Sequence, residues 1–274
     1  MNPKENAIKF TDPTKGEIKG FVGLQGKLKH PPFGRSPVDI IVPFHGQYEK
    51  VVKLIESVYR VRSNPYRLTL VDDGSPNPGF LAQLEGQPQI KCIRLEQQRG
   101  FGAALKVGYE ATEQPWVMFM HSDVECEDPL WMLKMGQTLL DLKDKNVKMV
   151  SARTNHPMCE DRRFIGLKGT TADHVVLQPG ESMPLFCAMC HRDLFKHIGG
   201  FIKEYPVAMY EDQELSHRMA AYGFKQAISG TSWVLHHGNA TISEVARTNP
   251  AALKEMEKNY DRCLADMKKY RVKK

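Results

Sequence analysis

The sequence predicts an α/β fold in which a mostly parallel central sheet is flanked by helices. Three observations predict it. Short apolar runs of strand length alternate with amphipathic segments of helical length. The run at 116–120 carries no charge, lies between Pro115 and the Asp-Pro pair at 128–129, and is typical of a strand buried on both faces. Several of these runs also end in polar clusters.

Length and composition are those of a globular protein with a substantial core. The chain has 274 residues, of which 41% are hydrophobic and 26% charged. It lacks an apolar stretch of membrane-spanning length, and its first residues lack the apolar region of a secretion signal. Six scattered cysteines then favour reduced, buried thiols, so we expect a cytoplasmic protein.

We expect three segments along the chain. Residues 1–36 form an extension rich in Lys, Gly and Pro, residues 37–245 the α/β domain, and residues 246–274 a basic C-terminal helix. The net charge is +6, and residues 251–274 hold eight Lys and Arg against four Asp and Glu. That tail is either a solvated helix face or a surface for an anionic partner, and it is compatible with peripheral contact with a membrane.

The first half of the domain alternates strands and helices. A helix before Asn64-Pro65 carries apolar residues at helical spacing, so one of its faces packs on the sheet. The predicted elements are a strand at 38–43, a helix at 51–61, strands at 66–71 and 89–95, a helix at 102–112 and the strand at 116–120.

The second half is less regular. Residues 153–180 show little periodicity, and we expect a mobile substrate loop there. The other predicted elements are a helix at 130–142, strands at 147–151 and 184–190, a short helix at 191–198, a helix at 210–222, a strand at 232–237 and a helical tail from Pro250.

Polar side chains follow three predicted strands at the same end. His45 follows the first strand, Asp72 and Asp73 the second, and Asp123 the strand at 116–120. Ligands of open α/β sheets bind beyond the carboxyl ends of the strands, where parallel neighbours bring such residues together. We therefore expect Asp123 to hold a divalent metal that bridges a nucleotide diphosphate.

Six sequence motifs, in the same order along the chain, resemble those of the family 2 glycosyltransferases, which have the GT-A fold. Within that family the chain is most similar to a rhamnosyltransferase-like subgroup. The similarity covers roughly residues 37–245. It rests on the opening strand at 40–43, the turn at 71–75, the Gly-rich segment at 99–108, the metal motif at 120–123, the block from Gly199 to Arg218, and the histidines at 236–237.

The resemblance implies a nucleotide-diphosphate sugar as donor and a Mn²⁺ or Mg²⁺ ion. The sequence departs from the family pattern at two positions. His121 stands where the first Asp of a D-x-D motif is usual, and Lys106 stands where Asn is frequent. The implied metal ligands are Asp123 and His236, with His237 the alternative to His236 and the role of His121 open. The implied donor-binding residues are Pro43, Asp72, Asp73, Gly100, Gly102, Lys106 and Arg218.

The same resemblance points to Asp212 as the base of an inverting transfer, with Glu211 in reserve. An attacking acceptor hydroxyl needs such a base. Two plainer interpretations stay open: acids favour a helix N-terminus through the helix dipole, and Arg218 can pair with Glu214 four residues away.

Two other functions compete with a glycosyltransferase. One is a sugar nucleotidyltransferase, which the lack of a basic, Gly-rich loop after the first strand disfavours. The other is a catalytically degenerate binding domain, which His121 suggests. The acceptor stays open among a glycan, a lipid-linked glycan, a protein and a modified nucleic acid.

Overall fold

The computed structural model describes residues 33, 36–61, 64–157, 159–238 and 250–270. The expected extension at 1–36 lies outside the described residues except at positions 33 and 36, and the expected boundary near residue 245 lies outside them as well. Among the described helices none is both long and apolar enough to cross a membrane.

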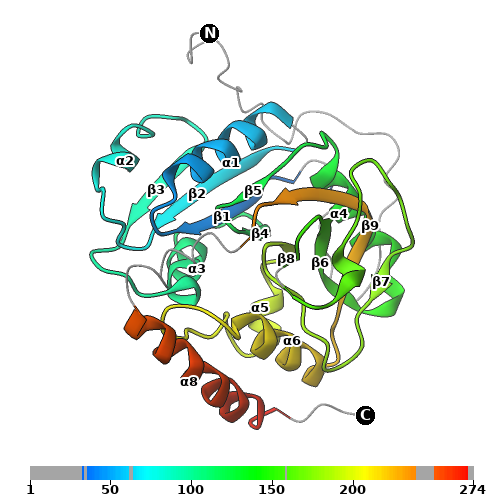
Figure 1. The fold of residues 1–274 in the computed structure, drawn as a ribbon. Coiled ribbons are helices and arrows are strands. Elements are labelled where there is room, and N and C mark those ends of the chain that lie inside the picture. Colours follow the sequence, from blue (N-terminus) through cyan, green and yellow to red (C-terminus); the bar gives the residue numbers. More distant parts are fainter. Residues whose placement is uncertain (1–32, 34–35, 62–63, 158, 239–249, 271–274) are drawn as a thin grey trace.

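A nine-stranded sheet forms the centre of the molecule, in the order β3-β2-β1-β4-β8-β6-β9-β5, with β7 paired to β9 (Figure 1). β3, β2, β1 and β4 are parallel, whereas β8 runs antiparallel to both its neighbours. The strands are β1 Val38–Phe44, β2 Tyr66–Asp72, β3 Ile90–Arg94, β4 Trp116–Met120, β5 Val124–Glu125, β6 Val147–Thr154, β7 Val175–Val176, β8 Cys187–His191 and β9 Lys225–His236.

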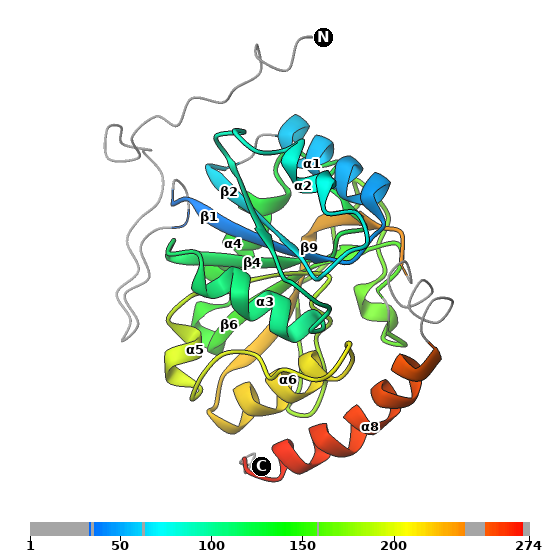
Figure 2. The ribbon, with the colours of Figure 1, turned by 90° about the vertical axis from the view of Figure 1, so that its left-hand side faces the viewer.

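Helices cover both faces of this sheet. α1 lies on one side and α3 and α6 on the other, and α8 packs on the outside of α6 (Figures 1 and 2). The helices are α1 Tyr48–Val61, α2 Gly79–Ala82, α3 Phe101–Glu110, α4 Trp131–Asp141, α5 Leu194–His197, α6 Glu211–Ala221 and α8 Pro250–Met267.

The fold class expected from the sequence is confirmed, and the sheet is mixed in its second half. Its parallel half carries the predicted order of strands and helices. α3 lies close to β1 and β2 because Gly108 faces them: a Cβ there would lie 2.4 Å from a methyl carbon of Ile41. No larger residue fits this helix–sheet contact without movement.

β9 begins at Lys225, seven residues before the predicted strand. The prediction missed this part because its buried residues include polar ones, among them Ser229. The Ser229 hydroxyl lies 2.8 Å from that of Thr138 on α4, so its burial is compensated by a hydrogen bond.

The segment expected to be a mobile loop, residues 153–180, is partly regular. It contains a 3-10 turn at Arg162–Phe164 and the short strand β7, which pairs with β9. Its mobility stays a prediction.

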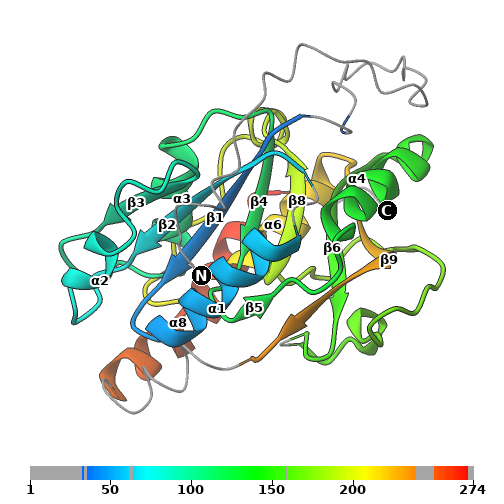
Figure 3. The same cartoon turned by 90° about the horizontal axis from the view of Figure 1, so that it is seen from above.

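All six cysteines carry free thiols. Cys187 and Cys190 are fully buried in β8, as expected for structural thiols. Seen from above, β8 lies between β4 and β6 and joins the two halves of the sheet (Figure 3).

Candidate active site

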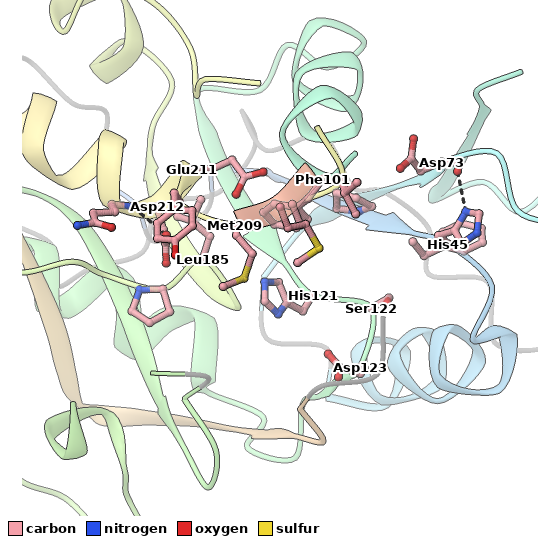
Figure 4. Close-up of a pocket in the computed structure, with 18 of the residues that line it drawn as sticks. His45, Asp73, Phe101, His121, Ser122, Asp123, Leu185, Met209, Glu211 and Asp212 are labelled. Carbon is pink, nitrogen blue, oxygen red and sulfur yellow. Dashed lines mark hydrogen bonds between the residues drawn. The ribbon is translucent and has the colours of Figure 1, made fainter. Parts of the chain in front are cut away.

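A cavity of about 340 Å³ opens at the carboxyl ends of the parallel strands. This volume is in the usual range for small-molecule sites. Its lining draws on the ends of β1, β2, β4 and β9 and on the starts of α3 and α6. Figure 4 shows His45 and Asp73 at one end, His121 in the middle, and Glu211 and Asp212 at the other end.

Three side chains in this cavity present ligand atoms within 4.8 Å of one another: His121, Asp123 and His236. The Nε2 atom of His236 lies 3.1 Å from Oδ1 of Asp123 and 3.3 Å from Nδ1 of His121. His121 and Asp123 follow β4, and His236 ends β9, where it pairs across the sheet with Val124. We call these three residues the metal cluster.

The protonation of His236 follows from its other ring nitrogen. Nδ1 lies 2.6 Å from the carbonyl oxygen of His156, which can only accept a hydrogen bond, so Nδ1 carries the proton. Nε2 is then the ring nitrogen that faces the Asp123 carboxylate, 3.1 Å away. A proton on Nε2 or a metal ion would satisfy this contact, and a histidine anchored to a carbonyl through its far nitrogen is the usual arrangement in metal sites.

The charges of the other two members also suit a cation. Burial acts to raise the pKa of Asp123, but the hydrogen bond to His236 and the nearby positive groups lower it to about 2. Burial, and then the charge of His236, lower the pKa of His121 to about 4. At neutral pH the carboxyl is therefore ionised and the His121 imidazole neutral, the forms that bind metal.

His237, the alternative to His236, points elsewhere. Its Nε2 lies 2.7 Å from the Glu125 carboxylate. Asn155, beside His156, supports His236 further: its amide oxygen accepts from the His236 backbone N–H at 2.8 Å and its amide nitrogen donates to the His236 carbonyl at 3.1 Å. Sequence reasoning missed Asn155 and His156, whose only signal was their place in a polar stretch after a strand.

Asp72 and Asp73 have different surroundings although they are adjacent. The Asp72 carboxylate is fully buried, pairs with Arg94 and accepts from the Ser75 backbone N–H at 2.8 Å. Asp73 lines the cavity, and its carboxylate accepts from the backbone N–H groups of Arg99 (2.7 Å) and Gly100 (2.9 Å). Burial raises the pKa of Asp73, and those two amides oppose the rise.

Gly100 and Gly102 lie where the backbone of a later segment passes closely. Gly100 has a φ of 100°, and a Cβ there would lie 2.8 Å from the backbone nitrogen and oxygen of Val207. A Cβ on Gly102 would lie 2.6 Å from the Lys203 carbonyl oxygen. Both positions therefore exclude side chains. Pro43 lines the cavity, as predicted for a donor-binding residue.

Lys106 and Arg218, also predicted to bind the donor, are engaged elsewhere. Lys106 is exposed and its Nζ lies 2.7 Å from the Glu204 carboxylate. Arg218 is buried and pairs with Glu214, with Nε 2.9 Å from Oε1.

The Arg218 guanidinium also donates to the carbonyls of Gly200 (2.7 Å) and Phe201 (2.8 Å). Arg218 thus ties α6 to the Gly-Gly-Phe segment that precedes it. The structure thus contains the Arg218–Glu214 pair that the sequence allows, together with contacts that hold the segment before α6, and donor binding by Arg218 stays a prediction.

Glu211 and Asp212 begin α6 and face the cavity (Figure 4). Burial, and then the charge of Asp212, raise the pKa of Glu211 to about 8, so this carboxyl is mostly protonated at pH 7. Burial raises the pKa of Asp212 to about 6, which leaves most of it ionised at pH 7. A general base must be ionised, and of these two acids Asp212 is the one that is mostly ionised at pH 7.

The strand order, with the cavity and its carboxylates at one edge, defines a GT-A fold. Among solved structures, the crystal structure of GalNAc-T7 with UDP, GalNAc and Mn²⁺ superimposes with a TM-score of 0.57 at 14% identity, over 74% of this chain and 44% of that one. S. aureus TarS 1–349 in complex with UDP-GlcNAc gives 0.53 at 16% identity, over 76% of this chain and 61% of that one.

A family model described as Glycosyl transferase family 2 matches residues 39–199, more than half of the chain. The O-antigen biosynthesis protein RfbC of Myxococcus xanthus is 22% identical over 248 residues, which are 82% of this chain and 19% of that protein. The chain belongs to glycosyl transferase family 2. It spans about a fifth of the length of RfbC.

Proposed function

We propose that the protein transfers a sugar, with inversion, from a nucleotide-diphosphate donor to an acceptor hydroxyl, with a divalent metal ion bound. The observation that carries the proposal is a single cavity that holds the metal cluster in its middle and a carboxylate with the pKa of a base at one end. Family membership supports the reaction class.

His121, Asp123 and His236 would hold the metal ion. One carboxylate and two imidazoles suit Mn²⁺ better than Mg²⁺, which prefers oxygen ligands. When bound, the ion neutralises the charge that develops on the diphosphate leaving group.

Asp73 and the turn it holds at residues 99–100 would bind the nucleoside end of the donor. Asp73 lies at the end of the cavity opposite Asp212 (Figure 4). The nucleoside would bind at this end, because the sugar must lie between the diphosphate and the catalytic base Asp212. UDP is the first nucleotide to test, because two proteins of similar fold were crystallised with UDP or UDP-GlcNAc.

Asp212 would take the proton of the acceptor hydroxyl as its oxygen attacks the anomeric carbon. The bond from that carbon to the diphosphate oxygen breaks with its electron pair, and the nucleoside diphosphate leaves. Attack from the face opposite the leaving group inverts the anomeric centre. Glu211, mostly protonated at neutral pH, would serve as a neutral hydrogen-bond donor beside the base.

The test is release of nucleoside diphosphate from a panel of nucleotide sugars with Mn²⁺, followed by Asp212→Asn. We expect the substitution to lower turnover by about 10²-fold or more and to leave Mn²⁺·UDP binding intact. Glu211→Gln is the matched control on the neighbouring residue. Near-normal turnover in Asp212→Asn would show that the base is another group.

The panel also separates the competing functions. Release of pyrophosphate in place of a nucleoside diphosphate would indicate a nucleotidyltransferase, and complete inactivity would indicate a binding domain. The rhamnosyltransferase-like subgroup, the cytoplasmic location and the acceptor stay predictions. The products of the panel would name the sugar.

A further inference from the structure

The chain immediately before the proposed base has a strained backbone. Val207, Met209 and Tyr210 have φ values of 68°, 86° and 76°. Positive φ is uncommon outside glycine and a clear outlier for a β-branched residue such as Val207. Such strain persists only where the surroundings impose it, and it gathers at functional sites. We call residues 206–210 the strained segment.

On its inner side the strained segment contacts the Gly-rich turn of the donor site. The Val207 carbonyl accepts from the Phe101 backbone N–H at 2.8 Å, and Gly100 lies against the Val207 backbone. Residues 207–210 line the cavity, and the chain continues directly into Glu211 and Asp212. The segment therefore connects the Asp73 end of the cavity to the Asp212 end.

On its outer side the strained segment packs against α8, and one side chain of that helix makes two hydrogen bonds to it. Asn259 is fully buried, and its amide nitrogen donates to the carbonyl oxygens of Pro206 and Ala208, both at 2.8 Å. Its amide oxygen accepts from the Arg262 guanidinium at 2.7 Å. Both amide hydrogens thus go to carbonyls on either side of Val207, the residue least suited to its φ.

Further contacts from α8 surround this one. The Cys263 thiol lies 3.7 Å from the Tyr210 carbonyl oxygen, and Met256 reaches the cavity wall. The Tyr205 hydroxyl donates to Asp266 at 3.0 Å, just before the strained segment.

We propose that Asn259 is a positioning residue for catalysis, which fixes the strained segment so that Asp212 faces the acceptor side of the cavity. This inference rests on the proposed role of Asp212. Asn259 lies outside residues 39–199, where the family model matches, so family membership alone does not point to this contact. A side chain with two donor hydrogens on one nitrogen is required to bridge the two carbonyls.

The test compares Asn259→Asp with Tyr205→Phe in the full-length chain. Aspartate keeps the size of asparagine and can still bind Arg262, but it donates to neither carbonyl. Tyr205→Phe removes a contact between α8 and the preceding loop without touching the carbonyls of the strained segment, so it reports general loosening of α8.

The first measurement is hydrogen exchange of the peptide spanning residues 206–213, which begins after Tyr205 and needs no substrate. We expect Asn259→Asp to exchange faster there than Tyr205→Phe. The second measurement is kcat on a nucleotide sugar that the panel identifies, expressed per Mn²⁺·UDP binding site so that unfolded chains are not counted. We expect kcat to fall about 10-fold to 100-fold while the Kd for Mn²⁺·UDP is unchanged.

Equal exchange in the two variants would overturn the inference, and so would faster exchange with kcat per site unchanged. Inactivity of the unsubstituted protein on every donor would reject the proposed function instead. The exchange result would then still decide whether Asn259 holds the strained segment.

Discussion

At the scale of single residues, the adjacent histidines His236 and His237 have different partners, and only His236 belongs to the metal cluster. His236 Nε2 faces Asp123, whereas His237 is 2.7 Å from Glu125. We expect His236→Ala to weaken Mn²⁺ binding in the presence of UDP by about 10-fold or more, because it removes one of the three proposed ligands and not only a residue that supports one. His237→Ala is the matched control and should bind Mn²⁺ normally. Titration calorimetry with Mn²⁺ and UDP measures both variants, and equal losses would contradict the assignment of His236.

The pH dependence of turnover distinguishes the two acids at the start of α6. A base must be ionised, so turnover falls as the pH drops through its pKa. The pKa of Asp212 is raised to about 6 and that of Glu211 to about 8. Besides Glu211, the titratable groups of Cys159 and Cys263 lie near Asp212, and burial raises the pKa of both thiols, so they stay neutral at this pH.

We therefore expect kcat to decrease below about pH 6, and Glu211→Gln to retain that limb. A limb near pH 8 that disappears in Glu211→Gln would make Glu211 the base. Steady-state rates measured from about pH 5 to about pH 9 give both profiles, because this range includes the pKa values of both acids.

The sequence predicts the type and position of the site residues, but not the direction in which each side chain points. Asp72 and Asp73 stood in the same motif, yet only Asp73 lines the cavity, because successive side chains at a strand end point to opposite sides. Donor binding by Lys106 stays a prediction, and in this structure its Nζ pairs with Glu204, 98 residues away in the sequence. Contacts between residues so far apart leave no periodic signal in a single sequence.

At the scale of elements, the start of α3 and the start of α6 are in close contact. A Cβ on Gly102 would lie 2.6 Å from the Lys203 carbonyl oxygen and 3.2 Å from Cγ of Glu211. We expect Gly102→Ala to lower the free energy of unfolding by about 1–3 kcal/mol and to impair turnover, because α6 must move. In α2, Gly79→Ala is the control, since its Cβ would meet only Asn77, at 3.4 Å. Urea unfolding and turnover of both variants check this, and equal stability would contradict it.

The elements themselves were easier to predict than their pairing. Apolar periodicity located α1, α3 and the four parallel strands because each buries a face on the sheet. β7 has only two residues, and the first half of β9 buries Gln226, Ser229 and Gly230 among its apolar residues, so neither shows an alternating pattern. The sequence predicts the C-terminal helix, but the side chain that bridges two carbonyls of the strained segment is an asparagine, a residue type that sequence patterns assign to turns.

At the scale of the whole molecule, the cavity draws on both halves of the sheet, so a ligand bound there should stabilise the entire domain. We expect Mn²⁺ with UDP, at about a hundred times the Kd, to increase the free energy of unfolding by about 2.7 kcal/mol. Asp123→Asn should lose most of the increase because it removes the charged member of the metal cluster. Thermal unfolding with and without EDTA measures the difference, and an increase of equal size in Asp123→Asn would count against the metal cluster.

The metal cluster joins the end of β4 to the end of β9, and His121 and His236 are 115 residues apart in the sequence. The parallel half of the sheet can pair while the chain is being synthesised, but β9 must be complete before His236 reaches Asp123. Competence to bind the metal would therefore arise late during biosynthesis. A nascent chain that ends before β9 lacks His236, one of the three members of the metal cluster.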